Sequence, residues 1–286
     1  MANLKEIRNR IATVSSTMQI TSAMKMVSAA KLKKAQDAIT AMRPYANKLT
    51  ELLQSLSETL DTDSDNVFAT QREVNNVLLV AITSNKGLCG AFNSSIVKAS
   101  QRLAREEYAK DQVHFVTIGK KGNDILKKSH KVISNNNAVF DDLTFDNVAT
   151  VAEELMMLFS RGDYDKIVLV YNRFKNAATQ IVQTEDFLPI APIESKNTIP
   201  TDYIFEPDKA EIVETLIPKS LKTQLYKAIR DSFASEHGAR MTAMHKATDN
   251  AGALKDELTL NYNKARQAAI TGEILEIVGG AEALNG

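Results

Sequence analysis

The chain has 286 residues, 44% hydrophobic and 24% charged, which is the composition of an ordinary globular protein with one large domain or two modest ones. Its 35 basic residues balance its 35 acidic residues, which argues against a uniformly basic nucleic-acid-binding protein. The one cysteine, Cys89, excludes an intrachain disulfide and a cysteine-based metal cluster. The longest apolar runs, such as residues 77–82, are much shorter than the ~20 residues that span a bilayer. We therefore expect membrane contact only through a partner.

The charge is unevenly distributed along the chain. Residues 1–50 contain nine basic and two acidic residues, whereas residues 51–218 contain 17 basic and 25 acidic residues. Residues 219–286 are close to neutral, with nine basic and eight acidic residues. Such asymmetry predicts separate partners for separate parts of the chain, although solvated helix faces also vary in charge without any such role.

Residues 1–60 are predicted to form a first long helix. Residues on one stripe recur at alternating intervals of three and four, as in a coiled coil: Leu4, Ile7, Ile11, Val14, Met18 and Thr21. Past Thr21 the stripe is expected to become small and mixed, through Ala23, Met24, Val27 and Ala30. Pro44 predicts a kink, after which the helix resumes. A basic, amphipathic N-terminus is also typical of an organellar transit peptide, but the periodicity continues without a break, which favours a mature helix.

Residues 208–286 are predicted to form a second long helix. The same alternation runs over four heptads, at Met244, Ala247, Ala251, Leu254, Leu258, Asn261, Ala265, Ala268, Gly272 and Leu275. A helix with so many small residues is marginal alone and must be held by packing. The economical partner is the first helix, and the pair is expected to run antiparallel because the chain between them must fold back.

Residues 73–190 are predicted to form a small α/β domain, after a polar loop at residues 61–72. Strands are expected at residues 77–83, 113–118 and 167–171, helices at residues 93–110 and 146–160, and a further strand at residues 181–187 as an edge hairpin. Four prolines mark residues 191–207 as an extended return segment. The predicted fold class is α/β: a long antiparallel coiled coil of the N- and C-terminal helices with an inserted Rossmann-like α/β domain.

The residues suggest no catalytic or metal-binding set. Glycine turns follow strands at residues 84–90 and 119–122, but neither has the spacing of a specific phosphate-binding loop. The four histidines lack the i,i+4 spacing of a helical metal pair. His114 is expected at the edge of the core, and Cys89 is expected to pack beneath its turn. We predict no cofactor, no metal and no catalytic residue, and mechanical or scaffold work rather than turnover.

Several motifs resemble the γ subunit of F-type ATP synthases, of the bacterial type. They are residues 20–32 (ITSAMKMVSAAKL), the GLCG turn at residues 87–90, residues 239–251 with ARMTAM and ATDNA, and residues 262–271 (YNKARQAAIT). The motifs are long and stand in family order at both ends of the chain, whereas the middle is matched mainly by its layout.

The resemblance implies a central rotor shaft. In the family, the antiparallel coil sits inside a ring of α and β subunits, and the α/β foot docks on the ε subunit and the membrane-embedded c-ring. Proton-driven rotation of the c-ring is coupled to ATP synthesis and hydrolysis at the β-subunit sites, and the shaft regulates ATPase activity. The resemblance implies a non-catalytic subunit that binds no nucleic acid and lies peripherally on the cytoplasmic face of the bacterial inner membrane.

The resemblance also implies contact residues. Arg266, Gln267 and Thr271 match the segment that touches the β "catch" loop, and Met24 matches a neighbouring position on the first helix. Contact with acidic loops of the β subunits is expected for the lysines Lys25, Lys31, Lys33 and Lys34. The foot segment near the c-ring and ε is matched by Tyr203, Phe205 and Glu206. An apolar tip is expected to act as a bearing in an apolar sleeve, through Ile270, Ile274, Ile277 and Val278.

The sequence departs from the family at two positions. Relatives often have a second tyrosine where Phe205 stands, so a contact that needs this hydroxyl is in doubt. Gly272 replaces a commoner amide residue, which loosens the helix beside Thr271. With Cys89 alone, the thiol switch of chloroplast relatives is excluded. Two other classes remain open: a nucleotide-dependent enzyme with helical arms, and a free-standing coiled-coil scaffold with an α/β domain.

Overall fold

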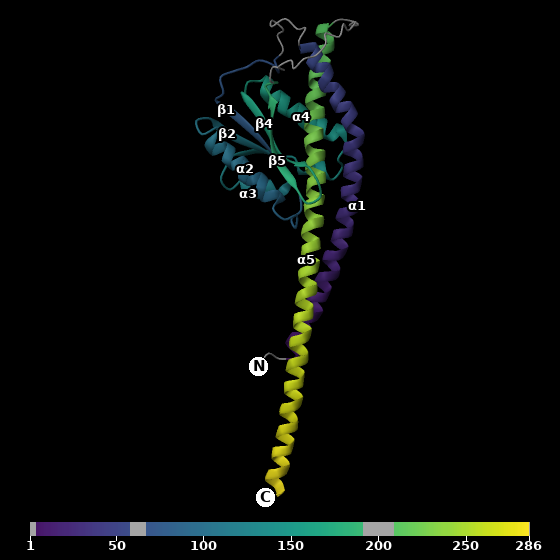
Figure 1. Ribbon diagram of the computed structural model, residues 1–286. Coiled ribbons are helices and arrows are strands. Elements are labelled where there is room, and N and C mark those ends of the chain that lie inside the picture. Colours follow the sequence, from purple (N-terminus) through teal and green to yellow (C-terminus); the bar gives the residue numbers. More distant parts are fainter. Residues whose placement is uncertain (1–3, 58–66, 191–208, 286) are drawn as a thin grey trace. The chain divides into compact units, whose positions relative to one another are not determined.

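The structure is a computed structural model that describes residues 4–57, 67–190 and 209–285 (Figure 1). It divides into two compact units: unit 1, residues 1–28 and 241–286, and unit 2, residues 29–240. Two long helices, α1 (Leu4–Ser57) and α5 (Lys209–Asn285), contribute a segment to each unit. Each helix is one element, α1 through Pro44 and α5 through Pro218. The first half of the predicted loop, residues 61–66, and the whole return segment at residues 191–207 lie outside the described residues.

Unit 1 is a pair of antiparallel helices. Arg8 Nη2 on α1 donates a hydrogen bond of 2.7 Å to the Tyr262 hydroxyl on α5. Further along α1, Thr21 Oγ1 accepts a hydrogen bond of 2.8 Å from Thr248 Oγ1. Residue numbers on α5 fall as those on α1 rise, which defines the antiparallel direction. These contacts confirm the predicted pairing of the two ends of the chain.

The buried stripe of α1 agrees with the predicted spacing up to Thr21 and then differs from it. All six predicted positions from Leu4 to Thr21 are buried or half-buried. Past Thr21 the predicted stripe is wrong, because Val27 and Ala30 are exposed. The alternation continues instead on buried residues, at Ser28, Leu32, Ala35 and Ile39. A serine fits this stripe because its hydroxyl donates to the Met24 carbonyl of its own helix, at 2.7 Å.

On α5 the predicted stripe is right at Met244, Ala251 and Ala265 but wrong at two positions between them. Leu254 is 45% exposed and Asn261 is exposed, and the neighbouring residues Lys255 and Tyr262 are half-buried in their place. An alternating spacing of three and four residues allows either of two neighbouring residues to lie on the buried stripe. Long side chains such as Lys and Tyr can occupy it because their apolar stems pack while their polar ends reach water. Past Ala265 the prediction also fails, since Leu275 is 66% exposed. The reason is the level at which the two helices pair: Arg8, near the start of the described part of α1, contacts Tyr262, thirteen residues before Leu275.

Unit 2 is built on a five-stranded sheet in the order β3-β2-β1-β4-β5. The strands are β1 (Asn76–Ile82), β2 (Gln112–Ile118), β3 (Val132–Asn135), β4 (Lys166–Phe174) and β5 (Gln180–Leu188). The pairs β1–β2, β1–β4 and β2–β3 are parallel, whereas β5 is antiparallel to β4 at the sheet edge. The predicted edge hairpin is therefore present.

Helices cover both faces of this sheet. Because side chains alternate along a strand, Leu78 and Val80 of β1 join the core with α4 (Phe145–Ser160) and α5, whereas Val77 and Leu79 join the core with α2 (Phe92–Glu106). Figure 1 shows α4 beside α5 in this unit. Both cores are built on buried apolar side chains, so a shift of the strand register by one residue would expose them, and the register is fixed. The predicted fold class is confirmed.

Three elements are absent from the sequence prediction: α3 (Lys120–Leu126), the short strand β3 and the 3₁₀ helix η1 (Asn137–Phe140). The predicted turn at residues 119–122 is in fact the start of α3. Gly119 has φ +113°, and a Cβ there would lie 2.2 Å from the Thr83 carbonyl oxygen. A Cβ at Gly122 would lie 2.7 Å from Thr83 Oγ1, so both glycines are needed for α3 to pack against the end of β1.

Candidate functional site

The predicted contact residues lie on both helices of unit 1. Met24 and Lys25 are half-buried on α1, whereas Arg266, Gln267 and Thr271 are exposed on α5. The foot residues Tyr203, Phe205 and Glu206 lie outside the described residues. The other three lysines predicted to contact the β subunits, Lys31, Lys33 and Lys34, are exposed on the part of α1 that belongs to unit 2.

The structure does not bring these contact residues together. Thr21, next to Met24 on α1, is level with Thr248, whereas Arg266 lies past Tyr262 on α5. At ~1.5 Å per residue, Thr248 and Arg266 are about 27 Å apart along the helix axis. The two helices of unit 1 therefore offer two contact regions at different levels.

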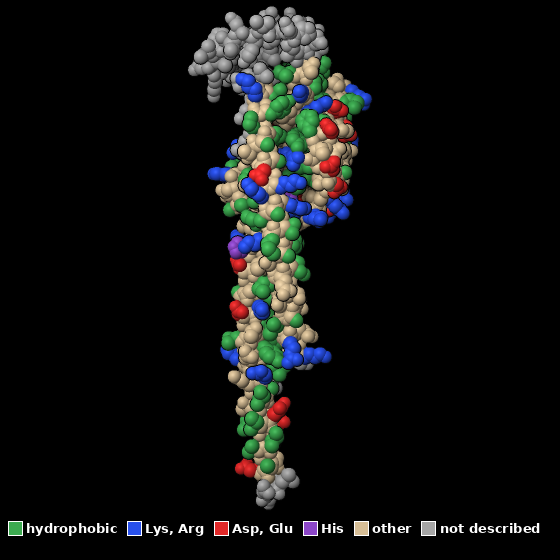
Figure 2. Space-filling view, turned by 90° about the vertical axis from the view of Figure 1, so that its right-hand side faces the viewer, with side chains coloured by type: hydrophobic (Ala, Val, Ile, Leu, Met, Phe, Trp, Pro, Cys, Tyr) green, Lys and Arg blue, Asp and Glu red, His purple; other side chains and the backbone are tan. Residues whose placement is uncertain are grey.

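The last turns of α5 carry exposed apolar side chains. Ile270 is 48% exposed and Ile277 is 71% exposed, and Ile274 and Val278 lie between these values. Figure 2 shows hydrophobic side chains on the surface of this segment together with acidic ones. After Arg266 the sequence has three glutamates and no Lys or Arg. Contiguous exposed apolar surface on a helix marks a contact with another chain.

The first glycine turn, residues 84–90, is held by side-chain hydrogen bonds. The Ser84 amide donates to Asn93 Oδ1 at 2.9 Å, and Asn93 Nδ2 donates to Cys89 Sγ at 3.2 Å. Cys89 is buried beneath the turn, as predicted, and this burial raises the pKa of its thiol. Leu88, at the outside of the turn, has φ +61° and is 65% exposed.

The second glycine turn uses its amides within the protein. The three backbone amides of residues 120–122 donate to Asn85 Oδ1, the Ser84 carbonyl and Thr83 Oγ1, at 3.0, 3.0 and 2.9 Å. These are the groups that a phosphate would need at the start of a helix. The turn is therefore a structural junction between β1 and α3.

α5 occupies the position where a doubly wound sheet binds its ligand. That position lies outside the carboxyl ends of the strands where the strand order reverses, here β1 and β4. At the end of β4, Ser235 Oγ donates to the Asn172 carbonyl at 2.9 Å. After β1, Arg240 Nη2 donates to the carbonyls of Lys86 and Gly87, at 3.1 and 3.2 Å.

A buried charged cluster fixes this contact between α5 and the turn after β1. Arg240 and Glu236 are each 7% exposed, and Arg240 Nη1 donates to Glu236 Oε1 at 2.6 Å. Burial raises the pKa of Glu236, against the opposing effect of Arg240. Arg240 Nη1 also lies 3.4 Å from His237 Nδ1, and the ring of Phe233 meets the His237 ring edge-on. A neutral imidazole can accept from arginine at Nδ1, whereas a protonated one cannot.

His237 should therefore make the stability of the chain depend on pH. Burial, reinforced by Arg240 and Lys31, lowers the pKa of His237 to about 3. The histidine of the unfolded chain titrates near pH 6.5, so the contribution of neutral His237 to the free energy of unfolding is fully present above that pH. This contribution is lost progressively as the pH falls from about 6.5 toward 3. When the pH is lowered from 7.5 to 5, the free energy of unfolding of the wild-type chain should fall by about 2 kcal/mol more than that of the His237→Phe variant. Urea denaturation at the two pH values measures this difference.

Glu236 contributes to the pH dependence of both proteins, so the difference between them isolates the histidine. An identical loss in wild type and His237→Phe would contradict a neutral, buried His237.

The role of the charged cluster is absent from the sequence prediction. Arg240 belongs to a motif that carries the family resemblance, but neither its partner nor its position on the strand ends is predicted. The available signal is the placement of Glu236 and Arg240 one helical turn apart, in a segment otherwise built of small and apolar residues. Such a pair is usually solvated, and only the fold shows that this one is buried.

Among the described residues, no helix has the length and hydrophobicity to cross a bilayer, and no group of three or more potential ligands is placed to hold a metal ion. His114 is half-buried at the edge of the core, where its Nδ1 lies 2.9 Å from the Tyr164 hydroxyl.

The geometry defines a protein with two long terminal helices, paired antiparallel at the chain ends and joined by an inserted mixed sheet. The sequence model of the ATP synthase family matches residues 3–284. A relative from Flavobacterium johnsoniae, named ATP synthase gamma chain, is 72% identical over 287 residues, with 100% of each chain covered.

Solved structures agree with this match. A chain of the Tetrahymena thermophila mitochondrial ATP synthase, from a structure of its central stalk and c-ring, is 28% identical with a TM-score of 0.58, covering 80% of this chain and 99% of that one. A chain of the Euglena gracilis mitochondrial ATP synthase shares the fold, with a TM-score of 0.70 at 22% identity, covering 98% and 94%. The chain therefore belongs to the ATP synthase family, among its γ chains.

Proposed function

We propose that this chain is the central rotor shaft of an F-type ATP synthase. It couples proton-driven rotation of the c-ring to ATP synthesis and hydrolysis at sites on the β subunits, and it regulates the ATPase activity of the complex. It is itself non-catalytic. Membership of the family and the antiparallel pairing of the two chain ends support this function.

The observation that carries the proposal is the exposed apolar surface near the C-terminal end of α5. Past Tyr262 this helix continues to Asn285, and its apolar residues from Ile270 to Val278 are about half exposed or more. Burying that surface is favourable by roughly 25 cal/mol per Å², so it calls for a surrounding apolar surface. The α and β subunits supply that surface as a sleeve, in which the end of α5 turns. Solvent exposure of these side chains in the assembled complex would contradict the bearing role.

The other partners are the ε subunit and the c-ring, which contact Tyr203, Phe205 and Glu206. Met24, Lys25, Arg266, Gln267 and Thr271 contact the β subunits. The chain lies on the cytoplasmic face of the bacterial inner membrane and reaches the membrane only through the c-ring. The high identity to a bacterial relative supports this location.

Purification from membranes tests the proposal. A tagged chain should bring down α, β and ε subunits and c-ring, together with ATPase activity. A free-standing coiled-coil scaffold would purify without α and β, and a nucleotide-dependent enzyme would bind labelled nucleotide as an isolated chain. If either of these results were obtained instead of the intact complex, the proposed function as a rotor shaft would be refuted.

Reversing the charge of Lys25 should impair coupling. Lys25 is half-buried on α1, and a glutamate there would repel acidic loops of the β subunits instead of attracting them. A partly exposed pair is worth about 1 kcal/mol, so ATP synthesis driven by a proton gradient should fall roughly fivefold relative to ATP hydrolysis. The exposed Lys128 of unit 2 provides the control, and Lys128→Glu should behave as wild type. Unchanged synthesis and hydrolysis in Lys25→Glu would count against the contact.

A further inference from the structure

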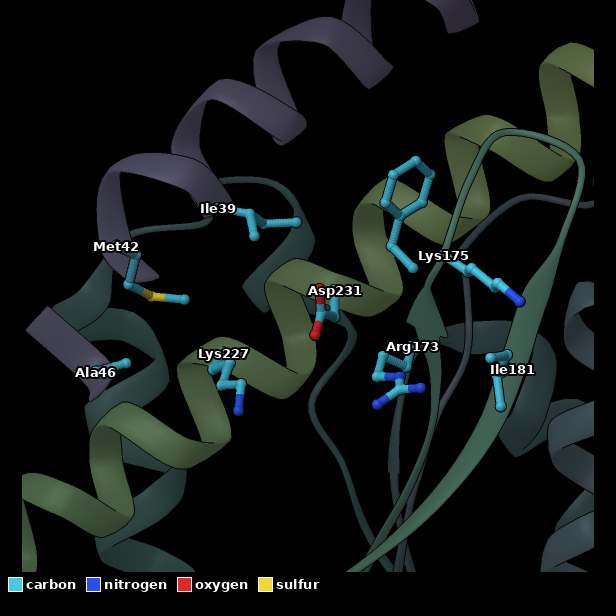
Figure 3. Close-up of a pocket in the computed structure, with 9 residues that line it drawn as sticks. Ile39, Met42, Ala46, Arg173, Lys175, Ile181, Lys227 and Asp231 are labelled. Atoms are coloured by element: carbon cyan, nitrogen blue, oxygen red, sulfur yellow. The ribbon is translucent and has the colours of Figure 1, made fainter. Parts of the chain in front are cut away.

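Unit 2 contains a pocket that the shaft role does not use. It has a volume of about 550 Å³ and lies between α1, α5 and the β4–β5 hairpin (Figure 3). Pockets of 300–1,000 Å³ are the size that holds small organic ligands. Because three elements form its walls, a bound molecule would contact both long helices and the sheet edge at once.

One side of the pocket is apolar. Ile39 and Met42 line it from α1, and Phe174 and Ile181 line it from the hairpin. Ile39 is buried and the other three are half-buried, so this wall is partly open to a ligand. Such a wall favours an aliphatic or aromatic body over a small inorganic ion.

The other side of the pocket is cationic. Arg173, Lys175 and Lys227 line it, and none of the three forms an ion pair or a side-chain hydrogen bond with a described residue. In Figure 3 the ends of Arg173 and Lys227 lie on either side of Asp231, while Lys175 points away. All three cationic side chains are exposed, so they can reach an incoming anion.

The head group of the ligand follows from these charges. The planar guanidinium of Arg173 fits a carboxylate in a two-point hydrogen bond, and the Lys227 ammonium adds a point charge. Asp231 is the one carboxylate among the described lining residues, is buried, and has interactions of its own. Its negative charge disfavours a multiply charged head such as a polyphosphate. We propose that the pocket between α1, α5 and the β4–β5 hairpin binds an organic monoanion of the fatty-acid class, with its carboxylate at Arg173 and Lys227 and its chain against Ile39 and Met42.

This inference is independent of the rotor role, because it concerns the folded chain itself. Calorimetric titration of the full chain with decanoate, below the concentration at which decanoate forms micelles, tests it. Decanoate should bind at one site, and decanol, which has the same chain without the charge, should bind at least tenfold more weakly. No binding of decanoate, or equal binding of decanol, would overturn the proposal.

Two variants locate the site. Arg173→Gln with Lys227→Gln removes both cations and should weaken decanoate binding about 10–100-fold, the effect of losing charge-assisted hydrogen bonds. Ala46→Phe keeps both charges but fills the pocket from α1, where Figure 3 shows Ala46 beside Met42, and should also abolish binding. Lys128→Ala removes an exposed lysine elsewhere in unit 2 and should bind as wild type. Wild-type affinity in either pocket variant would place the ligand elsewhere.

Methyl resonances give a readout that does not depend on affinity. With ¹³C-labelled methionine methyl groups, saturating decanoate should shift the resonance of Met42, which lines the pocket. Met157 on α4 is 45% exposed and does not line it, so its resonance should stay in place. An unmoved Met42 resonance at saturation would overturn the site.

Discussion

Replacing Arg240 with methionine should lower the free energy of unfolding of the chain by about 3–5 kcal/mol, the cost of leaving one partner of a buried ion pair without the other. The variant strands the Glu236 carboxylate at 7% exposure and frees the carbonyls of Lys86 and Gly87. Urea denaturation measures the loss. Faster hydrogen exchange at residues 84–90 should accompany it, because the turn loses its anchor on α5.

A double variant separates the charge effect from the packing effect. Arg240→Met combined with Glu236→Leu removes both charges and should recover most of the lost stability, since an apolar pair of similar volume often replaces a buried ion pair without loss. Arg10 and Glu6 form a pair of the same 2.6 Å length and the same i,i+4 spacing, but both are more than half exposed. Arg10→Met should therefore leave stability nearly unchanged. A small effect of Arg240→Met, equal to that of Arg10→Met, would show that the cluster does not hold α5 to the turn.

Replacing Gly119 with alanine should prevent the chain from folding in soluble form. The added Cβ would lie 2.2 Å from the Thr83 carbonyl oxygen. In addition, residues that have a side chain rarely adopt a φ angle of +113°. The neighbouring atom is backbone of a buried strand end, so it cannot move aside cheaply. The expected loss exceeds about 4 kcal/mol, a large part of the roughly 5–15 kcal/mol by which a typical protein is stable. Soluble expression and circular dichroism of the full chain measure it.

Gly90 gives the matched control. It also has a positive φ, +59°, but nothing lies within 4 Å of its added Cβ. Gly90→Ala should therefore cost only the ~1–2 kcal/mol of a left-handed alanine and should stay soluble. If the Gly119→Ala variant folds as well as the Gly90→Ala variant, the inference that close packing of α3 against the end of β1 excludes a side chain at residue 119 is wrong.

The periodic parts of the fold could be predicted from the sequence because their patterns are long. The stripe from Leu4 to Thr21 and the apolar run of β1 each predict one structure, and both are observed. The prediction fails where a residue's polarity does not decide its burial. Ser28 is buried because its hydroxyl bonds to its own helix, and Tyr262 replaces Asn261 on the stripe because its hydroxyl reaches Arg8.

The site is less predictable than the fold. The apolar residues after Tyr262 could be named from the sequence. That α1 does not cover them in unit 1 follows only from the level at which the helices pair, with Arg8, one turn after Leu4, in contact with Tyr262. The cluster of Glu236, His237 and Arg240 depends on α5 lying across the ends of β1 and β4, a contact between residues over 150 positions apart. Local spacing carries no information about such a contact.

The placement of α5 in unit 2 also determines when this protein can fold during its synthesis. The sheet face that carries Leu78 and Val80 is completed by Leu221 and Leu225 of α5. At the other end of the chain, Arg8 finds its partner 254 residues later. A ribosome makes about 5–20 residues per second, so the part of this sheet face that α5 covers, beside α4, stays uncovered for many seconds after β1 is made. During that time the uncovered apolar surface is exposed to aggregation, a risk that ends only when α5 has been made.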